Sequence, residues 1–243
     1  VAGLVAWSLL GSPLLVVGLG RLLGVEPSIL ALMVATAACS PIMVAPALAL
    51  LLGLDAALVL VVLLPATALV PFTVPPIAFY LGGLVLDLPV AALSLRLALI
   101  VLGSALAAQL LRRWLGPARL VAGAPVLDGP AVLGFVLFAV GVMDGFTHTA
   151  WRQPWLVAGI VVAVFALNVG LQAATALLLL PWATWRLALT AGLLAGNNNF
   201  GLVLASTVDA APPLMLVYVA AAQFPIYLLP TLQRRLYPRL LRG

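Results

Sequence analysis

Residues 154–180 form a continuous stretch without a single charged side chain. A helix of roughly 20 apolar residues crosses the about 30 Å of hydrocarbon in a bilayer. Stretches of this kind follow one another along the chain, so 65% of its residues are hydrophobic and only 7% are charged. Soluble domains carry about 25% charged residues. The sequence therefore predicts an all-α integral membrane protein whose main partner is the lipid bilayer.

Charged residues, glycines and prolines divide the apolar sequence into about eight predicted transmembrane helices. Their ranges are 2–20, 28–53, 56–82, 89–114, 130–147, 154–180, 184–207 and 212–233. The longest predicted loop is 116–129, and the others are too short to hold a soluble domain. We therefore predict a single membrane domain over 1–243 that ends in a tail, 234–243.

The arginines are distributed unequally between the two predicted sides of the bilayer. Eight of them fall on the side of the N-terminus, namely Arg112, Arg113, Arg119, Arg186, Arg234, Arg235, Arg239 and Arg242. The opposite side has Arg21, Arg96 and Arg152. Cytoplasmic loops are the richer in basic residues, so we expect both termini in the cytoplasm. We predict a prokaryotic plasma (inner) membrane as the location of the chain. The arginines are scattered singly or in pairs, which argues against a nucleic-acid partner.

Two of the predicted helices are interrupted by helix-breaking sequences. The second contains ACSPIMVAP at 38–46, and the seventh contains GNNNFG at 196–201. Each is followed by a helix with two spaced prolines. Spans one to three thus resemble spans six to eight with an offset of five, which inverts the orientation, as in inverted-repeat transporters. Residues 1–82 would be the end of a first repeat (three spans) and 89–233 a second repeat (five spans). Chance similarity between apolar segments is the alternative.

Three consecutive asparagines, Asn197, Asn198 and Asn199, interrupt one of the most apolar stretches. Side chains 100° apart on a helix cannot all face one neighbour, and an unpaired amide in hydrocarbon costs several kcal/mol. With Gly196 and Gly201 beside them, they predict a helix that unwinds inside the membrane and turns polar groups towards a solute or ion. The alternative is that they only join helices by hydrogen bonds.

The other interruption carries hydroxyl and thiol groups next to prolines. Pro41 and Pro46 each remove a helix N–H, and Thr36, Cys39 and Ser40 lie beside them. We predict a second helix break and substrate- or ion-binding groups there; an ordinary proline kink is the alternative. Isolated polar residues in other spans could line a pathway, but they are more typical of helix–helix hydrogen bonds. These are Thr67, Asn168, Gln172 and Gln223.

All acidic residues fall at the ends of predicted helices. They are Glu26, Asp55, Asp87, Asp128, Asp144 and Asp209. A catalytic carboxylate or proton relay inside the bilayer therefore has no candidate, and Ser40 has no basic partner there. Cys39 is the only cysteine, which excludes an intrachain disulfide and a cysteine metal cluster. We expect neither enzymatic activity nor a cofactor.

Three stretches resemble the bile acid:sodium symporter family. The stretch CSPIMVAPALALLLGLDAALVLVVLLPATALVPFTVPP is similar to its fourth and fifth spans, GNNNFGLVLAS to its ninth and AAQFPIYLLPTLQRRLY to its tenth. The resemblance implies a ten-span fold of two inverted repeats whose broken helices cross, so the first two spans would be missing from this chain. It also implies secondary active transport, by alternating access, of a small organic anion or amphipathic solute.

The family's functional residues carry over only in part. Asn198 and Asn199 match the Gln/Asn pair of the ninth span, Pro41 the fourth-span break, and Thr67 a hydroxyl near a sodium site. Sodium would be the coupling ion near Asn198, Asn199 and Thr67. However, Leu194 stands where an acidic residue is expected, and Pro46 with the next residue replaces a Ser-Asn pair, so sodium coupling is doubtful.

Two alternative functions stay open. Arsenite efflux permeases of the same superfamily have a motif close to NNFGLVLA and a cysteine that Cys39 would match, but Gly201 replaces their acidic residue. The missing first two spans also fit a non-transporting membrane component or a truncated product. The oligomeric state, the substrate and the direction of transport have no signal in the sequence.

Overall fold

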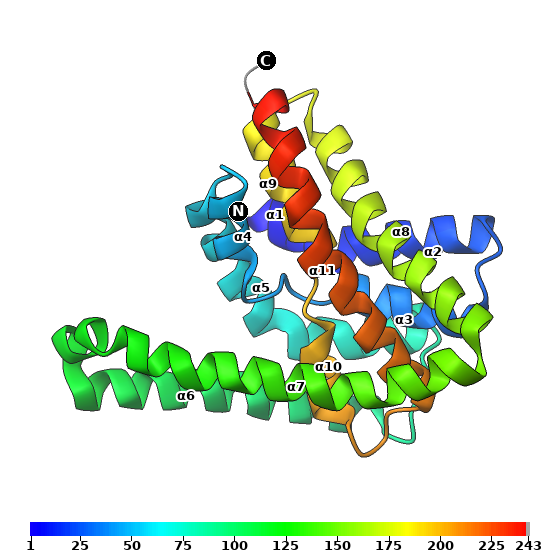
Figure 1. The fold of residues 1–243 in the computed structure, drawn as a ribbon, viewed down its shortest axis with the longest axis horizontal. Coiled ribbons are helices and arrows are strands. Elements are labelled where there is room, and N and C mark those ends of the chain that lie inside the picture. Colours follow the sequence, from blue (N-terminus) through cyan, green and yellow to red (C-terminus); the bar gives the residue numbers. More distant parts are fainter. Residues whose placement is uncertain (242–243) are drawn as a thin grey trace.

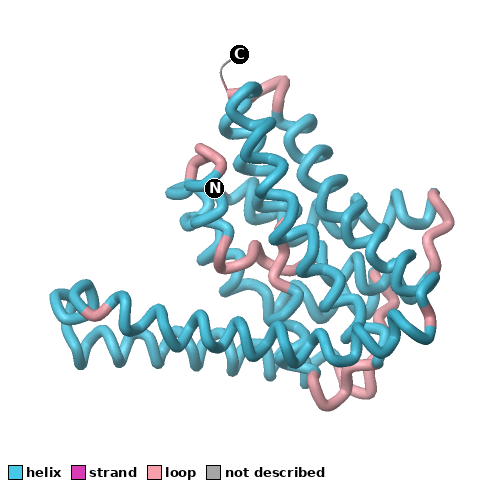
Figure 2. Tube along the Cα trace, viewed as in Figure 1, coloured by secondary structure: helices cyan, strands magenta, loops and turns pink. Residues whose placement is uncertain are grey.

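The computed structural model describes residues 1–241, apart from several side chains between positions 117 and 144. Helices make up 82% of the chain, and no strand occurs in the described range (Figure 2). Five helices are long and apolar enough to cross a membrane. They are Ala2–Leu22, Ala56–Leu81, Val90–Gly116, Pro154–Leu179 and Pro213–Leu240. The all-α prediction and the membrane character of the chain are confirmed.

Helical segments occupy all eight predicted ranges, and the second and seventh are each divided in two. The elements are α1 (Ala2–Ala6), η1 (Trp7–Gly11), α2 (Ser12–Leu22), α3 (Pro27–Ala37), α4 (Ala45–Leu51), α5 (Ala56–Pro76), η2 (Ile77–Leu81), α6 (Val90–Ala122), α7 (Ala124–Arg152), α8 (Pro154–Leu179), α9 (Trp185–Gly196), α10 (Phe200–Thr207) and α11 (Pro213–Leu240). The η elements are wider, π-helical turns that continue their neighbouring helices.

Two of the few acidic side chains start helices. The carboxylate of Glu26 accepts hydrogen bonds from the backbone N–H groups of Ser28 (3.1 Å) and Ile29 (3.0 Å), which caps α3. A hydrogen bond from the Ser28 hydroxyl is the main reason that the pKa of Glu26 is lowered. Asp55 caps α5 through the N–H of Leu58 at 2.9 Å. The acids stand at helix ends because they satisfy N–H groups that have no partner within the helix.

Helices α6 and α7 form a long hairpin that projects from the compact body of the other helices (Figure 1). Within that body, α6 packs against α5 and α10, whereas α7 packs against α11 and α8. The predicted loop at 116–129 is wrong: both helices continue through it, and the chain bends at Gly116, whose φ is 73°. A positive φ of this size suits glycine, which lacks a Cβ.

The same order of elements occurs twice along the chain. A long helical segment (α1 to α2) is followed by a broken helix (α3, α4) and by a long helix (α5). The order returns as α8, then α9 with α10, then α11. In both sets the first helix packs against the first half of the broken one.

The buried hydrophobic residues fall into two clusters, with a polar layer between them. Several long helices pass from one cluster to the other, for example between Ala66 and Val70 in α5 and between Leu171 and Ala176 in α8. Buried polar side chains lie at this level. They include Ser12, Ser40, Asn168, Gln172, Thr175, Asn197 and Asn198.

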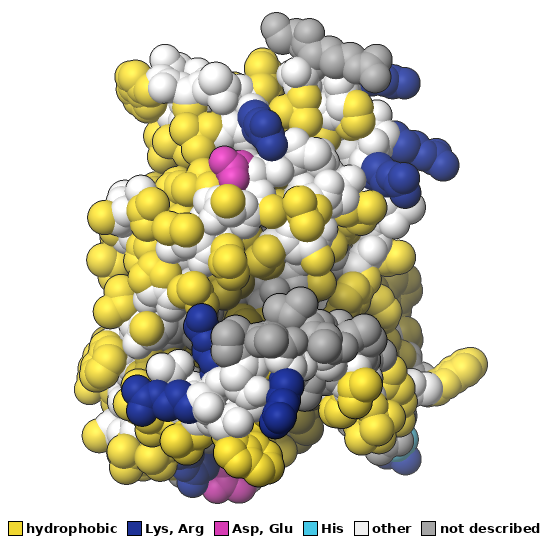
Figure 3. Space-filling view, turned by 90° about the vertical axis from the view of Figure 1, so that its left-hand side faces the viewer, with side chains coloured by type: hydrophobic (Ala, Val, Ile, Leu, Met, Phe, Trp, Pro, Cys, Tyr) yellow, Lys and Arg dark blue, Asp and Glu magenta, His cyan; other side chains and the backbone are white. Residues whose placement is uncertain are grey.

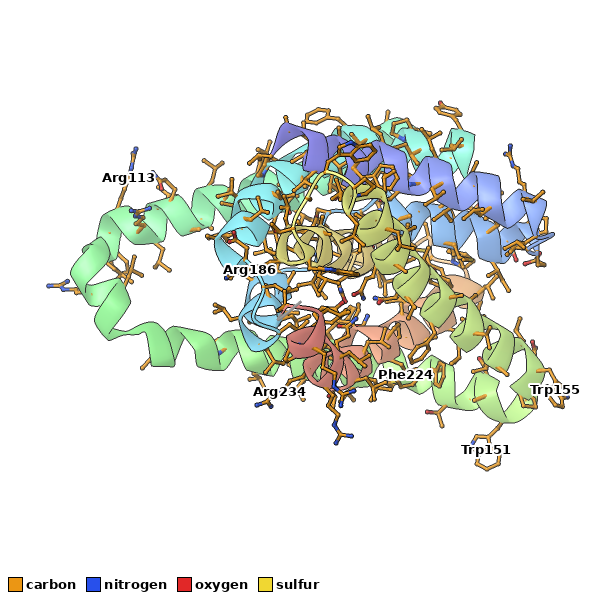
Figure 4. All side chains as sticks on the ribbon, turned by 90° about the horizontal axis from the view of Figure 1, so that it is seen from above. Arg113, Trp151, Trp155, Arg186, Phe224 and Arg234 are labelled. Carbon is orange, nitrogen blue, oxygen red and sulfur yellow. The ribbon has the colours of Figure 1, made fainter. Side chains whose placement is uncertain are left out.

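The ends of the helices differ in charge and carry exposed aromatic residues. Loops after α2, η2, α7 and α10 lie towards the lower and right-hand sides of Figure 2, and those after α4, α6 and α8 towards its upper and left-hand sides. Figure 3 shows the side of the molecule that lies at the left in Figure 1, and arginine side chains are spread over it. Trp151 and Trp155 are 85% and 88% exposed at the opposite end (Figure 4). Exposed tryptophans at helix ends are typical of membrane interfaces.

Candidate functional site

The two helix breaks meet in the middle of the molecule. The N–H of Ile42 donates to the carbonyl of Asn197 at 2.7 Å, and the N–H of Asn199 donates to the carbonyl of Ser40 at 2.8 Å. Pro41 and Asn198 thereby form an isolated antiparallel bridge. Each break satisfies backbone groups that the other has freed, which an ordinary proline kink does not do. We call residues 38–44 and 197–199 the crossing.

The three asparagines point to different partners. The amide of Asn197 donates to the carbonyl of Leu193 at 3.0 Å and so closes the end of α9. The amide of Asn198 reaches the other broken helix and donates to the carbonyl of Cys39 at 3.1 Å. The half-buried Asn199 lines a cavity. One asparagine side chain therefore joins the two broken helices, one closes its own helix, and the third lines the cavity.

The hydroxyl and thiol groups near the first break have separate orientations. The Thr67 hydroxyl from α5 donates to the carbonyl of Leu63 at 2.9 Å and lies 3.1 Å from the Ser40 hydroxyl, so the structure brings these two candidate residues together. Thr36 and Cys39 instead turn back onto α3: the Thr36 hydroxyl donates to Leu32 (2.7 Å), and the Cys39 thiol contacts the carbonyl of Ala35 (3.2 Å). Both lie within the bundle, 7% and 1% exposed.

The predicted sodium site near Asn198, Asn199 and Thr67 stays a prediction. Thr67 and the backbone of Asn199 both contact Ser40, but the amide of Asn198 is directed to Cys39. Within the described residues, no three His, Cys, Asp or Glu side chains form a metal-binding group. Leu194, in the position of the missing carboxylate, is fully buried.

The residues predicted to break the helices have different roles. Gly196 is the last residue of α9, Gly201 lies inside α10, and Pro46 lies in the first turn of α4. Neither glycine has a positive φ. A Cβ on Gly196 would lie 2.6 Å from the carbonyl oxygen of Asn168, so Gly196 is needed for close packing on α8 rather than for flexibility.

A buried amide network supports the second break, and two of its members, Asn168 and Gln172, form the helix–helix hydrogen bonds that were predicted for them. Asn168 donates to the carbonyl of Gly196 at 2.7 Å, and Gln172 donates to Asn168 at 2.6 Å. The Gln172 oxygen accepts hydrogen bonds from Gln233 (2.7 Å) and Tyr237 (3.1 Å) of α11. The network links the crossing to the end of α11. The spacing of four between Asn168 and Gln172 was a signal for it, because such residues share a helix face.

A cavity of about 280 Å³ opens beside the crossing. Its polar lining consists of Asn198, Asn199 and Gln223, next to the first residues of α10. The rest of the lining is aromatic and aliphatic and includes Phe138, Phe200, Phe224, Tyr227, Met43 and Met143. The ring of Phe224, labelled in Figure 4, stands edge-on to Phe146 of α7 with centroids 5.5 Å apart. We call this space the amide cavity.

Buried polar atoms near the crossing are not all satisfied. Within the described residues, the side-chain oxygen of Asn198 and the hydroxyl of Tyr218 have no hydrogen-bond partner. A buried polar group without a partner costs about 1–3 kcal/mol. These two buried atoms are therefore hydrogen-bonding groups near the crossing that the described residues leave without a partner.

No family model matches the chain, and the comparison with curated proteins found no match. The proposed function therefore depends on the geometry of the crossing and of the amide cavity.

Proposed function

We propose that this chain is a secondary transporter, with the ten-span inverted-repeat architecture of the bile acid:sodium symporter family. It would carry a small organic anion or amphipathic solute across the plasma membrane by alternating access. The observation that carries this proposal is the amide cavity beside two broken helices that meet inside an apolar bundle. Discontinuous helices of this kind form substrate sites in secondary transporters.

The lining of the amide cavity suits an anionic or hydrogen-bonding group on an apolar body. Asn199 and Gln223 offer amides, and the N-terminus of α10 begins at Phe200 with N–H groups and the positive end of the helix dipole. No arginine occurs among the described lining residues, so an anion would be held by hydrogen bonds and the dipole. The volume is close to the lower limit of about 300 Å³ for small-molecule sites.

For alternating access, the helices can be divided into two groups that move against each other, the α6–α7 hairpin and the rest of the bundle. The hairpin of α6 and α7 contacts the body along α5, α10 and α11, and its two arms have little contact with each other. Rocking of this hairpin against α3–α4, α5, α9–α10 and α11 would expose the amide cavity to one side of the membrane and then to the other. The alternative of arsenite efflux has less support, because Cys39 is not among the described residues that line the amide cavity.

Uptake into proteoliposomes tests this proposal. The purified full-length chain is reconstituted and supplied with a panel of radiolabelled organic anions. We expect accumulation of at least one of them, reduced by about tenfold to a hundredfold in Asn199→Ala, because a hydrogen bond to a charged group contributes about 1.5–3 kcal/mol. Asn198→Ala should reduce it as well, because it also loosens the crossing.

Ser104→Ala is the matched control. Ser104 is an exposed residue of α6 whose hydroxyl donates to the carbonyl of Val101, so this variant should transport like the wild type. If Asn198→Ala and Asn199→Ala bind and transport every accepted solute at the wild-type rate, the crossing is not the binding site. If no anion accumulates, the proposed substrate class is wrong.

A further inference from the structure

The last two turns of α11 extend beyond the length that the bilayer core requires. The helix has 28 residues, so it is roughly 42 Å long at 1.5 Å per residue, whereas the hydrocarbon core is about 30 Å thick. Its final residues, 233–240, read QRRLYPRL. We therefore place this segment, with Arg234, Arg235 and Arg239, at the depth of the lipid headgroups.

One face of this segment is fixed inside the bundle. Gln233 and the buried Tyr237 lie one turn apart, and both donate to the side-chain oxygen of Gln172 in α8. A helix has 3.6 residues per turn, so residues two positions before and after Tyr237 lie on the opposite face. They are Arg235 and Arg239, and both are exposed.

The outward face of the segment combines like charges with apolar side chains. Arg235 and Arg239 are one turn apart, where like charges repel each other, and neither is paired with a carboxylate among the described residues. Beside them, Leu232, Leu236 and Leu240 follow one another at intervals of four and are between 37% and 56% exposed. A row of leucines next to basic residues is typical of helices that lie at the surface of anionic membranes.

The loop between α8 and α9 lies at the same end. Gln172 is about two turns before the end of α8 at Leu179, so the hydrogen bond from Tyr237 brings this loop close to the end of α11 (Figure 1). Trp182 is exposed in the loop, and Arg186 is exposed in the first turn of α9. Exposed tryptophans are typical of membrane interfaces, so the loop and the segment suit the same environment.

Positive charge is in excess at this end. Its arginines are Arg186, Arg234, Arg235 and Arg239, and Figure 3 shows dark-blue side chains in the upper part of the molecule, at the height of the end of α11. The acidic Asp55 lies at the same end, because its N–H donates to the Thr190 hydroxyl one turn after Arg186, but its carboxylate caps α5. Arginine binds phosphate groups through paired N–H donors, so a phosphate would relieve the repulsion between these arginines.

We propose that the end of α11 binds an anionic phospholipid of the adjacent leaflet. Its phosphate lies on Arg235 and Arg239, and one of its acyl chains runs along Leu232 and Leu236. The leucines favour a lipid over a free phosphate ion. A second copy of the chain fits less well, because the same arginines would face each other across a two-fold axis. The proposal goes beyond the transport function and does not depend on it.

Titration of the purified full-length chain in detergent tests this site. Phosphatidylglycerol or phosphatidylcholine with the same acyl chains is added, retained lipids are counted by native mass spectrometry, and the melting temperature is measured by tryptophan fluorescence. With phosphatidylglycerol we expect at least one retained lipid and a saturable rise of about 5–10 °C at a concentration 100 times the Kd. Phosphatidylcholine should give neither. Glycerol 1-phosphate, which has a phosphate but no acyl chains, should also give no shift.

Single arginine variants assign the binding to this segment. Arg235→Gln and Arg239→Gln should each raise the half-saturating phosphatidylglycerol concentration about fivefold, and the double variant about thirtyfold. Arg235→Lys keeps the charge and should restore most of the affinity. Two controls each remove one exposed arginine elsewhere: Arg152→Gln at the opposite end, and Arg113→Gln on the projecting hairpin (Figure 4). Both should bind like the wild type.

Three results would overturn the proposal. The first is an equal response to the two phospholipids, and the second is an equal response to glycerol 1-phosphate, which would show a site for free anions. The third is an unchanged affinity in the double variant Arg235→Gln/Arg239→Gln. Lipids are counted by mass, so a variant of altered stability still gives an answer. A lipid-free dimer that the double variant loses would instead assign this face to a second copy of the chain.

Discussion

The three adjacent asparagines have three different environments. Asn197 closes its own helix, Asn198 binds the other broken helix, and Asn199 lines the amide cavity. Their number and position in an apolar stretch were enough to predict a helix break, because three amides cannot all be satisfied on one helix face. Their directions were not predictable, because they depend on which polar groups from α8, α9 and the residues after α3 lie beside each asparagine.

The glycines beside the asparagines illustrate a limit of the same argument. Sequence alone suggested that Gly196 and Gly201 unwind the helix. Instead, the carbonyl oxygen of Asn168 and the side chain of Gln172 leave no room for a Cβ at Gly196, whereas a Cβ at Gly201 would meet Phe138 at an ordinary 3.4 Å. Only the packing of α9 on α8 distinguishes the two positions, and that packing is a tertiary property.

Alanine should therefore be tolerated at one of these glycines and not at the other. Gly196→Ala forces a Cβ to 2.6 Å from a backbone oxygen. Overpacking of this kind costs about 1–3 kcal/mol, so we expect a melting temperature about 3–10 °C lower in detergent. Gly201→Ala should match or slightly exceed the wild type, since alanine favours helix. Equal destabilisation by both substitutions would show that flexibility, not packing, requires glycine at these positions.

At the scale of elements, the breaks in the two broken helices were located correctly, whereas the predicted loop between α6 and α7 was wrong. The ranges 28–53 and 184–207 each contain two short helices with a gap at the predicted break. The predicted loop at 116–129 is helical except for a kink at Gly116, which has a positive φ, and an interruption at Gly123 between α6 and α7. A proline in the first turn of α7 is compatible with a helix start. Turn residues predict where a chain can bend, but not how short the bend is.

The contact between α6 and α10 should depend on pH. Arg96 of α6 donates to Asp209 (3.0 Å between Nη2 and Oδ2) and to the carbonyl of Ser206 near the end of α10. The hydrogen bond from Arg96 lowers the pKa of Asp209 below its ordinary value of 3.8. A group with a lowered pKa stabilises the fold above its unfolded-state pKa, and this contribution disappears as the pH falls through the folded-state pKa.

Asp209→Asn measures this contribution. Because the pair is exposed, we expect the variant to melt no more than about 2 °C below the wild type at pH 7. The difference should shrink as the pH falls through the lowered pKa of the folded-state Asp209 carboxyl and vanish once that carboxyl is protonated. Arg96→Gln should behave in the same way, and the double variant should add nothing to either single one. A difference that persists in acid would mean that the side chains matter through packing rather than charge.

At the scale of the whole molecule, two features indicate how the bundle is oriented across a membrane. They are the polar layer in its middle and the different distribution of arginines and tryptophans at its two ends. The crossing lies between two hydrophobic clusters, as expected for a site at middle depth in a membrane. The left-hand part of Figure 4 contains Arg113, Arg186 and Arg234, and Trp151 and Trp155 lie at the right. Composition alone predicted this membrane character, because apolar stretches and arginine counts need no tertiary information.

The arginine bias predicts which end of α8 faces the cytoplasm. This helix has 26 residues, so it is roughly 39 Å long at 1.5 Å per residue and places Gln153 and Pro181 on opposite sides of the bilayer. Arg186 follows Pro181, and the arginine-rich end of α11 lies on the same side. By the positive-inside rule, Pro181 should be cytoplasmic and Gln153 external.

Single-cysteine labelling of cells tests this orientation. In a Cys39→Ala background, Gln153→Cys should react with a membrane-impermeant maleimide in intact cells, since Gln153 is exposed in the short loop before α8. Pro181→Cys, equally exposed, should react only after the membrane is opened. The background without cysteine should stay unlabelled in both conditions. The reverse pattern would invert the orientation of the whole bundle, and labelling of both positions in intact cells would mean that α8 does not cross the membrane.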